Sequence, residues 1–205
     1  MEIEQNVPRP RALVYGGPVA DPRRPALAAQ LMIGGYTVAQ LAVAVAGGSR
    51  SAFFRQFSPV STLLFLATIA VFLCWFHRCR LNAEQFAPGT HRFSSGLAIG
   101  AWFIPVVMWW IPRRITLDIW RAGSPVGGVW LVNAWWVAWL GKTVGGAIAI
   151  ELGAPRPYTY SPIEETVGVV AGVLAILLIH RVTAGQHARV RAAMQSPPFA
   201  RTAAS

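Results

Sequence analysis

Lys142 is the residue with the clearest chemical potential, because it is the only lysine in the chain and lies inside an apolar stretch. A lysine near the centre of a membrane-spanning helix costs about 2.5 to 3.5 kcal/mol, which the apolar residues around it roughly offset. Lys142 therefore needs a route outward or a partner. Two interpretations stay open. The side chain extends toward the outer interface, or it meets a ligand or an acid, for which the candidates are Glu151, Glu164 and Glu165.

The acidic residues all fall outside the centres of the apolar stretches. Proton-coupled carriers generally place an ionisable acid inside the bundle, so this pattern disfavours a proton-driven transporter. A small transporter or channel nevertheless remains an alternative, with a site near Lys142, Asn133 and Pro105. A proline-interrupted helix is a common way to build a ligand site within a membrane.

Four charged residues, Arg113, Arg114, Asp118 and Arg121, gather in a short segment. They could hold the phosphate of a lipid head group. The simpler interpretation is that the arginines set membrane topology, with Asp118 bonded to Arg114 or Arg121 at helical spacing.

Redox, metal and enzyme signals are weak. His77 and His180 end two apolar stretches and are weak candidates for a metal or haem bridging two helices. Cys74 and Cys79 point in directions about 140° apart on a helix, so we expect free thiols. The chain has none of the common hydrolase, metalloprotease, phosphate-loop or dinucleotide motifs. We predict no cofactor and favour a non-enzymatic protein.

Glycines at four-residue spacing occur in three apolar stretches and allow helix backbones to approach closely. This pattern indicates packing within one bundle or self-association of the protein. The residues concerned are Gly96, Gly100, Gly141, Gly145, Gly168 and Gly172.

Composition indicates which solvent surrounds these residues. Charged residues make up 13% and hydrophobic residues 54%, the mean hydropathy is +0.45 and the net charge is +10. Soluble domains carry about 25% charged residues. The arginines flank apolar blocks instead of covering one soluble face, which argues for membrane topology and against nucleic-acid binding.

Four stretches are long enough to span: 26–46, 60–76, 129–150 and 163–180. Residues 1–25 read as a disordered cytoplasmic leader and 182–205 as a cytoplasmic tail. The block 95–111 is short and contains Pro105, so we expect it to re-enter or lie in the interface. An amphipathic helix at 111–121, with Ile111, Ile115 and Ile119 on one face, then lies on the membrane.

Arginine placement decides between the two topologies. If 95–111 does not cross, most arginines fall on one side, which is the cytoplasmic side by the positive-inside rule. If it crosses, the two sides are nearly equal. Five tryptophans crowd the same region, as in an interfacial belt: Trp102, Trp109, Trp110, Trp120 and Trp130. We therefore predict a multi-pass protein of the cell membrane with both termini in the cytoplasm.

The stretch from Cys74 to Pro125 also resembles a known family. The residues that carry the resemblance are Arg78, Arg80, Asn82, the run FSSGLAIGAWFIP (93–105), Pro112 and the run DIWRAGSP (118–125). They resemble the domain of unknown function 4328 family of bacterial membrane proteins, which is frequent in actinomycetes. Met108 stands where that family usually has Asn. The resemblance implies architecture and localisation, and no activity.

These observations predict an all-α integral membrane bundle of four transmembrane helices, a proline-broken segment over 95–121 and a short amphipathic helix within it. The favoured function is a non-enzymatic scaffold, or a module that contacts lipid or a protein partner. The expected partners are the bilayer with its anionic head groups, and an unidentified protein or a second copy of the chain.

Overall fold

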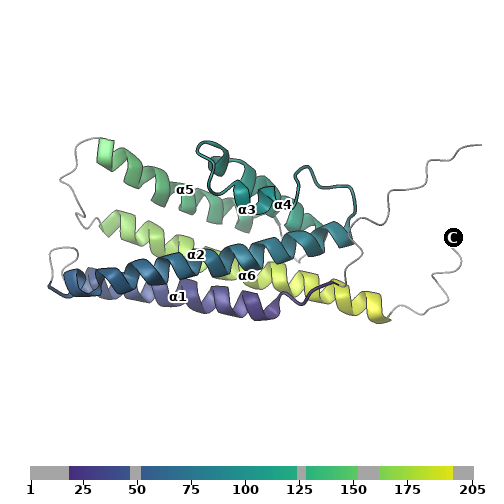
Figure 1. Cartoon of the computed structure of the whole chain (residues 1–205), viewed down its shortest axis with the longest axis horizontal. Coiled ribbons are helices and arrows are strands. Elements are labelled where there is room, and N and C mark those ends of the chain that lie inside the picture. The colour runs from purple at the N-terminus through teal and green to yellow at the C-terminus, as the bar shows by residue number, and fades with distance from the viewer. Residues whose placement is uncertain (1–18, 47–51, 124–127, 152–161, 196–205) are drawn as a thin grey trace, which may run out of the picture.

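Every regular element in the described residues is a helix (Figure 1). The computed structural model describes residues 19–46, 52–123, 128–151 and 162–195. Four long helices run alongside one another: α1 (Arg23–Val45), α2 (Ala52–Phe86), α5 (Trp130–Glu151) and α6 (Pro162–Gln195). Between α2 and α5 come α3 (Leu97–Gly100), the 3₁₀ helix η2 (Val107–Trp109) and α4 (Ile111–Gly123). Of these helices, α1, α2 and α6 are long and apolar enough to cross a membrane.

Helix starts follow local chemistry. Pro25 lies in the first turn of α1, where its missing N–H leaves no hydrogen bond unmade. The backbone N–H of Arg23 donates to Asp21 Oδ1 at 3.0 Å. Helix α6 begins at Pro162 and carries Glu164 and Glu165 in its first turn, where carboxylates complement the helix dipole.

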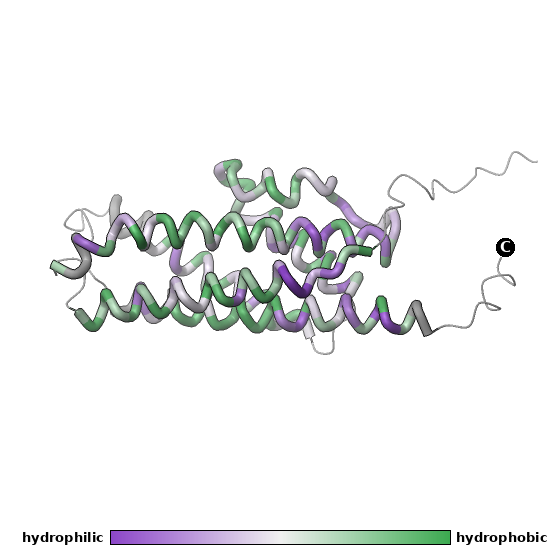
Figure 2. Tube along the Cα trace, turned by 60° about the horizontal axis from the view of Figure 1, so that its bottom comes forward, coloured by the Kyte–Doolittle hydropathy of each residue, from purple (hydrophilic) through white to green (hydrophobic). Residues whose placement is uncertain are grey.

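Helices α2 and α6 both extend beyond the apolar stretches that we predicted as spans, to Phe86 and Gln195. Hydrophobic residues dominate most of the bundle in Figure 2, and hydrophilic ones gather toward the end where α6 finishes. The predicted leader lies outside the described residues up to residue 18, and the predicted tail from residue 196 onward.

A buried polar network explains why these two helices stay ordered past their apolar parts. Asn82 is 1% exposed and Gln186 is 0% exposed. The amide of Asn82 donates to Ala20 O at 2.9 Å and to Gln186 Oε1 at 3.0 Å, and its Oδ1 accepts from the Ala20 N–H at 3.2 Å. Gln186 in turn donates to Cys79 O at 2.9 Å. Buried amides that are satisfied in this way hold a unique packing arrangement.

The four long helices form an open arc. Helix α1 packs against α2 and α6, and α6 packs against α5, whereas α2 and α5 share no extensive contact among the described residues. Trp102 lies between α2 and α5, the two helices at the ends of this arc. Its ring centroid is 5.6 Å from that of Phe72 on α2 and 5.5 Å from that of Trp139 on α5.

Trp102 belongs to the proline-broken segment, which does not form one straight helix. Pro105 is followed by Val106 at φ 68°, a conformation that a β-branched residue rarely adopts. In Figure 1 the trace leaves α3, turns and comes back beside it in α4. The apolar face of α4 is covered by protein, since Ile115 and Ile119 are each 1% exposed, and α4 packs against α2, α5 and α6. The prediction that this face lies on the membrane is therefore wrong, because the other helices cover it.

Gly172 provides a test of the α1–α6 interface. A Cβ added at Gly172 would lie 2.7 Å from Thr37 Oγ1, a hydroxyl that donates to Ile33 O at 2.8 Å. Gly172→Ala should therefore lower the free energy of unfolding by about 1 to 3 kcal/mol, because the helices must shift or the hydroxyl must move. Thermal unfolding of detergent-solubilised protein measures this.

Gly145→Ala is the matched control, since no described atom lies within 4 Å of a Cβ there. It should be neutral or stabilising by up to about 1 kcal/mol, the difference in helix propensity. Adding Thr37→Ala to Gly172→Ala should restore most of the loss. Equal loss in both glycine variants would contradict the close approach.

Candidate functional site

A cavity of about 590 Å³ lies between α1, α2, α5 and α6, and we call it the intrabundle cavity. Its volume is within the range of small-molecule sites, about 300 to 1,000 Å³. The walls are largely aromatic and aliphatic, and they include Ile33, Phe65, Phe72, Trp135 and Trp139.

Most polar side chains in these walls are already satisfied by protein. The hydroxyls of Thr37, Thr68 and Thr143 donate to backbone carbonyls of their own helices, Ile33 O, Leu64 O and Trp139 O, at 2.7 to 2.9 Å. Threonines bonded in this way present mainly their methyl groups to their surroundings. The walls therefore favour an apolar occupant.

One part of the cavity is charged. Lys142 Nζ lies 3.1 Å from Glu164 Oε1 and 3.5 Å from Glu165 Oε1. Lys142 and Glu165 line the cavity. The three side chains are between 22% and 36% exposed, so they remain within reach of a bound molecule. Of the two interpretations open for Lys142, the structure shows the pair with acids.

Gly168 makes room for this arrangement. A Cβ added there would lie 3.5 Å from Lys142 Cε and 3.6 Å from Cδ, so the lysine stem runs across the glycine. Gly141 faces Val167 at 3.4 Å across the same α5–α6 interface. Gly96, Gly100 and Gly145, in contrast, have no described atom within 4 Å of a built Cβ.

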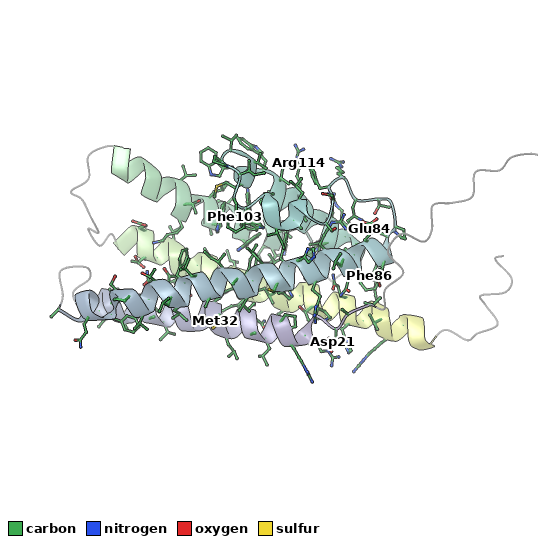
Figure 3. The ribbon with its side chains drawn as sticks, in the orientation of Figure 1. Asp21, Met32, Glu84, Phe86, Phe103 and Arg114 are labelled. Atoms are coloured by element: carbon green, nitrogen blue, oxygen red, sulfur yellow. The ribbon has the colours of Figure 1, made fainter. Side chains whose placement is uncertain are left out.

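The proline-broken segment supplies the rest of the lining through Trp102, Phe103 and Met108. Phe103 lines the cavity although it is 66% exposed, and Figure 3 labels it on the side of this segment nearest α5. Trp102 packs deeper, against Phe72 and Trp139. Met108, the position where the resemblance implies Asn, is thus an apolar residue that lines the cavity.

The charged residues predicted to act together are divided by the fold. Arg113 donates to Asn133 Oδ1 from Nε at 3.2 Å and from Nη2 at 2.6 Å, which joins α4 to α5. Arg114 is exposed on α4, as Figure 3 shows. Arg121 Nη1 lies 3.9 Å from Asp118 Oδ1.

Asp118 and Arg121 line a second hollow of about 270 Å³, with Thr90, Arg92 and Arg189 and a lining completed by Ala87 and Ala122. We call it the arginine hollow. The sequence alone assigns no ligand role to Arg92 or Arg189, because they are 29 and 68 residues from Arg121 along the chain. It also missed Tyr36 and Thr37 of the intrabundle cavity, whose types carry no signal by themselves.

The metal candidates lie apart from any ligand cluster. His77 is partly buried on α2, and His180 is exposed on α6. Cys74 is an exposed and Cys79 a buried free thiol. No group of three or more His, Cys, Asp or Glu side chains suited to a metal occurs in the part of the chain that the structure describes.

A charged cluster holds the loop after α2. Arg80 Nη1 lies 2.9 Å from Glu84 Oε2, and Arg80 Nη2 donates to Phe93 O at 2.6 Å. Glu84 also accepts from the Gly89 N–H at 3.1 Å and lies 3.2 Å from His91 Nδ1. The loop that carries Thr90 and Arg92 is thereby tied to α2. Glu84 lies near the end of that helix, close to Phe86, in Figure 3.

These features define a helical membrane protein with an apolar cavity that carries a lysine–glutamate cluster. The model of the domain of unknown function 4328 family matches residues 36–184, so the chain belongs to this family. No curated protein and no solved structure matches the chain.

His91 predicts a pH dependence of stability. Burial lowers the pKa of His91, and the nearby Arg80 charge lowers it further, against a raising effect of Glu84. In the unfolded chain the imidazole titrates near pH 6.5. Between that value and the lower folded pKa, the unfolded state binds more protons, so stability falls as the pH falls.

We therefore expect the melting temperature to drop between about pH 8 and about pH 5.5. The drop should be smaller in His91→Gln than in the wild type. His180→Gln, at an exposed position, should keep the full drop. The prediction fails if His91→Gln shows the wild-type pH dependence.

Proposed function

We propose that the protein crosses the cell membrane four times, through α1, α2, α5 and α6, with both termini in the cytoplasm. Helix α5 has 22 residues, and at 1.5 Å per residue it reaches about 33 Å, enough for a hydrocarbon core of about 30 Å. The segment 95–121 enters without crossing. The turn after Pro105 supports a segment that does not cross. The arginines gathered at one end of the bundle support placing that end in the cytoplasm.

In this membrane frame, we propose that the protein binds an amphipathic small molecule in the intrabundle cavity, as a membrane carrier or receptor. The single observation that carries this proposal is an apolar cavity of about 590 Å³ with Lys142 and Glu165 in its lining. Apolar walls favour a hydrocarbon or aromatic part, and the charged cluster favours a polar head.

The charge of the cluster indicates which head group fits. One lysine faces two glutamates, Glu164 and Glu165, so the formal net charge is −1. Tyr36 and Phe65 lie beside each other in the wall, with ring centroids 5.4 Å apart. Aromatic faces near a carboxylate attract cations. A cationic or zwitterionic amphiphile, with its head near Glu165 and its tail toward Trp102, suits both features.

Binding suits the geometry better than conduction. The rings of Trp102, Phe76, Trp135 and Trp136 pack together, and α4 packs against α2, α5 and α6 nearby. These side chains lie between the cavity and the cytoplasmic end in the proposed orientation. The sequence left two functions open, a scaffold and a small transporter or channel with a site near Lys142. Ligand binding near Lys142 therefore has more support than a scaffold role without a ligand.

Filling the cavity tests ligand binding. Ala171 lines the cavity, so Ala171→Phe should reduce its free volume. Val170→Phe is the matched control, since Val170 lies on the same helix and is 45% exposed. Purified protein is mixed with a tetraphenylphosphonium-type cation, and quenching of the tryptophans that line the cavity is titrated.

We expect Ala171→Phe to weaken binding about tenfold or more, since a well-filled site excludes the ligand. Val170→Phe should bind as the wild type does. Equal quenching in all three proteins, or equal loss in both variants, would overturn the proposal.

Cysteine accessibility tests the topology separately. Arg114→Cys places a thiol at an exposed position of α4, in a chain where Cys74→Ser removes the exposed native thiol. A membrane-impermeant maleimide should label this variant in inside-out vesicles and not in intact cells. Labelling in intact cells would place α4 outside the cell and contradict the proposed topology.

A further inference from the structure

We infer that the arginine hollow is a binding site for a phosphate group, separate from the intrabundle cavity. Its basic residues come from three parts of the chain. Arg92 lies in the loop after α2, Arg121 on α4 and Arg189 on α6. Three arginines from separate elements line this one hollow, a tertiary arrangement with no equivalent in the local sequence.

The charge of the hollow matches a phosphate. The residues that line the hollow include three arginines and one carboxylate, Asp118, so their formal charges sum to +2. A phosphate ester carries one or two negative charges near neutral pH. Guanidinium groups bind phosphate oxygens in a planar, bidentate geometry that ammonium groups cannot reproduce.

The distance between Asp118 and Arg121 indicates that Asp118 positions the Arg121 side chain. Arg121 Nη1 lies 3.9 Å from Asp118 Oδ1, well beyond the roughly 2.7 to 2.9 Å of a strong charge-assisted hydrogen bond. Asp118 is only 16% exposed, whereas Arg121 is 65% exposed. The carboxylate therefore restrains the arginine at the rim without enclosing it.

Arg189 on α6 and the loop that carries Arg92 are each held in place by contacts of their own. The guanidinium carbon of Arg189 lies 6.0 Å from the ring centroid of Phe86, which orients the side chain by a cation–π contact. Thr90 Oγ1 donates to Ala87 O at 2.8 Å, and the Gly89 N–H donates to Glu84 at 3.1 Å. A loop held in this way loses little conformational entropy when a ligand binds.

Size also fits. The volume of about 270 Å³ accommodates a head-group phosphate, and Ala87 and Ala122 keep the lining small. In the proposed topology the hollow faces the cytoplasm. Both anionic lipids of the cytoplasmic leaflet and soluble phosphates are available there, and they share this chemistry. The experiment below distinguishes a lipid phosphate from a soluble phosphate as the ligand.

The test uses the full chain in phosphatidylcholine nanodiscs, with or without phosphatidylglycerol. Lipids retained after release into detergent are counted by native mass spectrometry. In a second arm, inorganic phosphate is titrated into pure phosphatidylcholine nanodiscs, and the melting temperature is followed. The variants are Arg92→Gln and Arg189→Gln. Arg114→Gln is the matched control, since Arg114 is an exposed arginine outside the hollow.

If the phosphate belongs to a lipid, the wild type should retain phosphatidylglycerol about tenfold better than Arg92→Gln or Arg189→Gln, and Arg114→Gln should match the wild type. If it is a free anion, phosphate should raise the melting temperature of the wild type and of Arg114→Gln but not of the other two variants. The inference is overturned if neither arm responds, or if Arg114→Gln loses as much as the other variants. Neither arm depends on occupancy of the intrabundle cavity, so failure here leaves the proposed function standing.

Discussion

The shape of this bundle depends on one aromatic wedge, Trp102, which joins two helices that otherwise share little contact among the described residues. Its ring meets Phe72 on α2 and Trp139 on α5 at centroid distances of 5.6 and 5.5 Å. The wedge is short because the chain turns after Pro105 and cannot continue as a helix. A longer helix at this place would fill the gap between α2 and α5 along more of its length. Trp102, Phe103 and Met108 of this short segment line one side of the intrabundle cavity.

The two ends of the bundle accommodate different kinds of polar side chain, neutral amides at one end and charged groups at the other. Near the ends of α2 and α6, Asn82 and Gln186 are fully buried and bonded to each other and to backbone carbonyls. Neutral amides with complete partners stabilise one arrangement. Near the start of α6, beside the intrabundle cavity, Lys142, Glu164 and Glu165 remain partly exposed. Charges keep some hydration there, because full burial would cost several kcal/mol for each ion. The first cluster is thus closed to solvent, whereas the second stays partly exposed, as the proposed ligand site requires.

The sequence predicted much of the fold and less of the site. Apolar stretches indicated the four long helices, and the period of Ile111, Ile115 and Ile119 indicated α4. Lys142 was identified because a lysine among apolar residues needs a partner. The partners of Arg113 were beyond prediction, since Asn133 is 20 residues away and nothing local favours it over a lipid phosphate. For the same reason, Arg92 and Arg189 could not be associated with Arg121.

The sequence by itself determined the helical class, the length and apolar character of the helices, and the separation of arginines from the apolar centres. These properties follow from local periodicity and from the cost of placing charge in hydrocarbon, and both act residue by residue along the chain. Only the tertiary structure decided which side chains meet: Lys142 with Glu164 and Glu165, Gly172 with Thr37, and three distant arginines around one hollow. The physical reason is that each meeting depends on how helices pack across the bundle. Packing is a property of pairs of helix surfaces, which no single stretch of residues specifies.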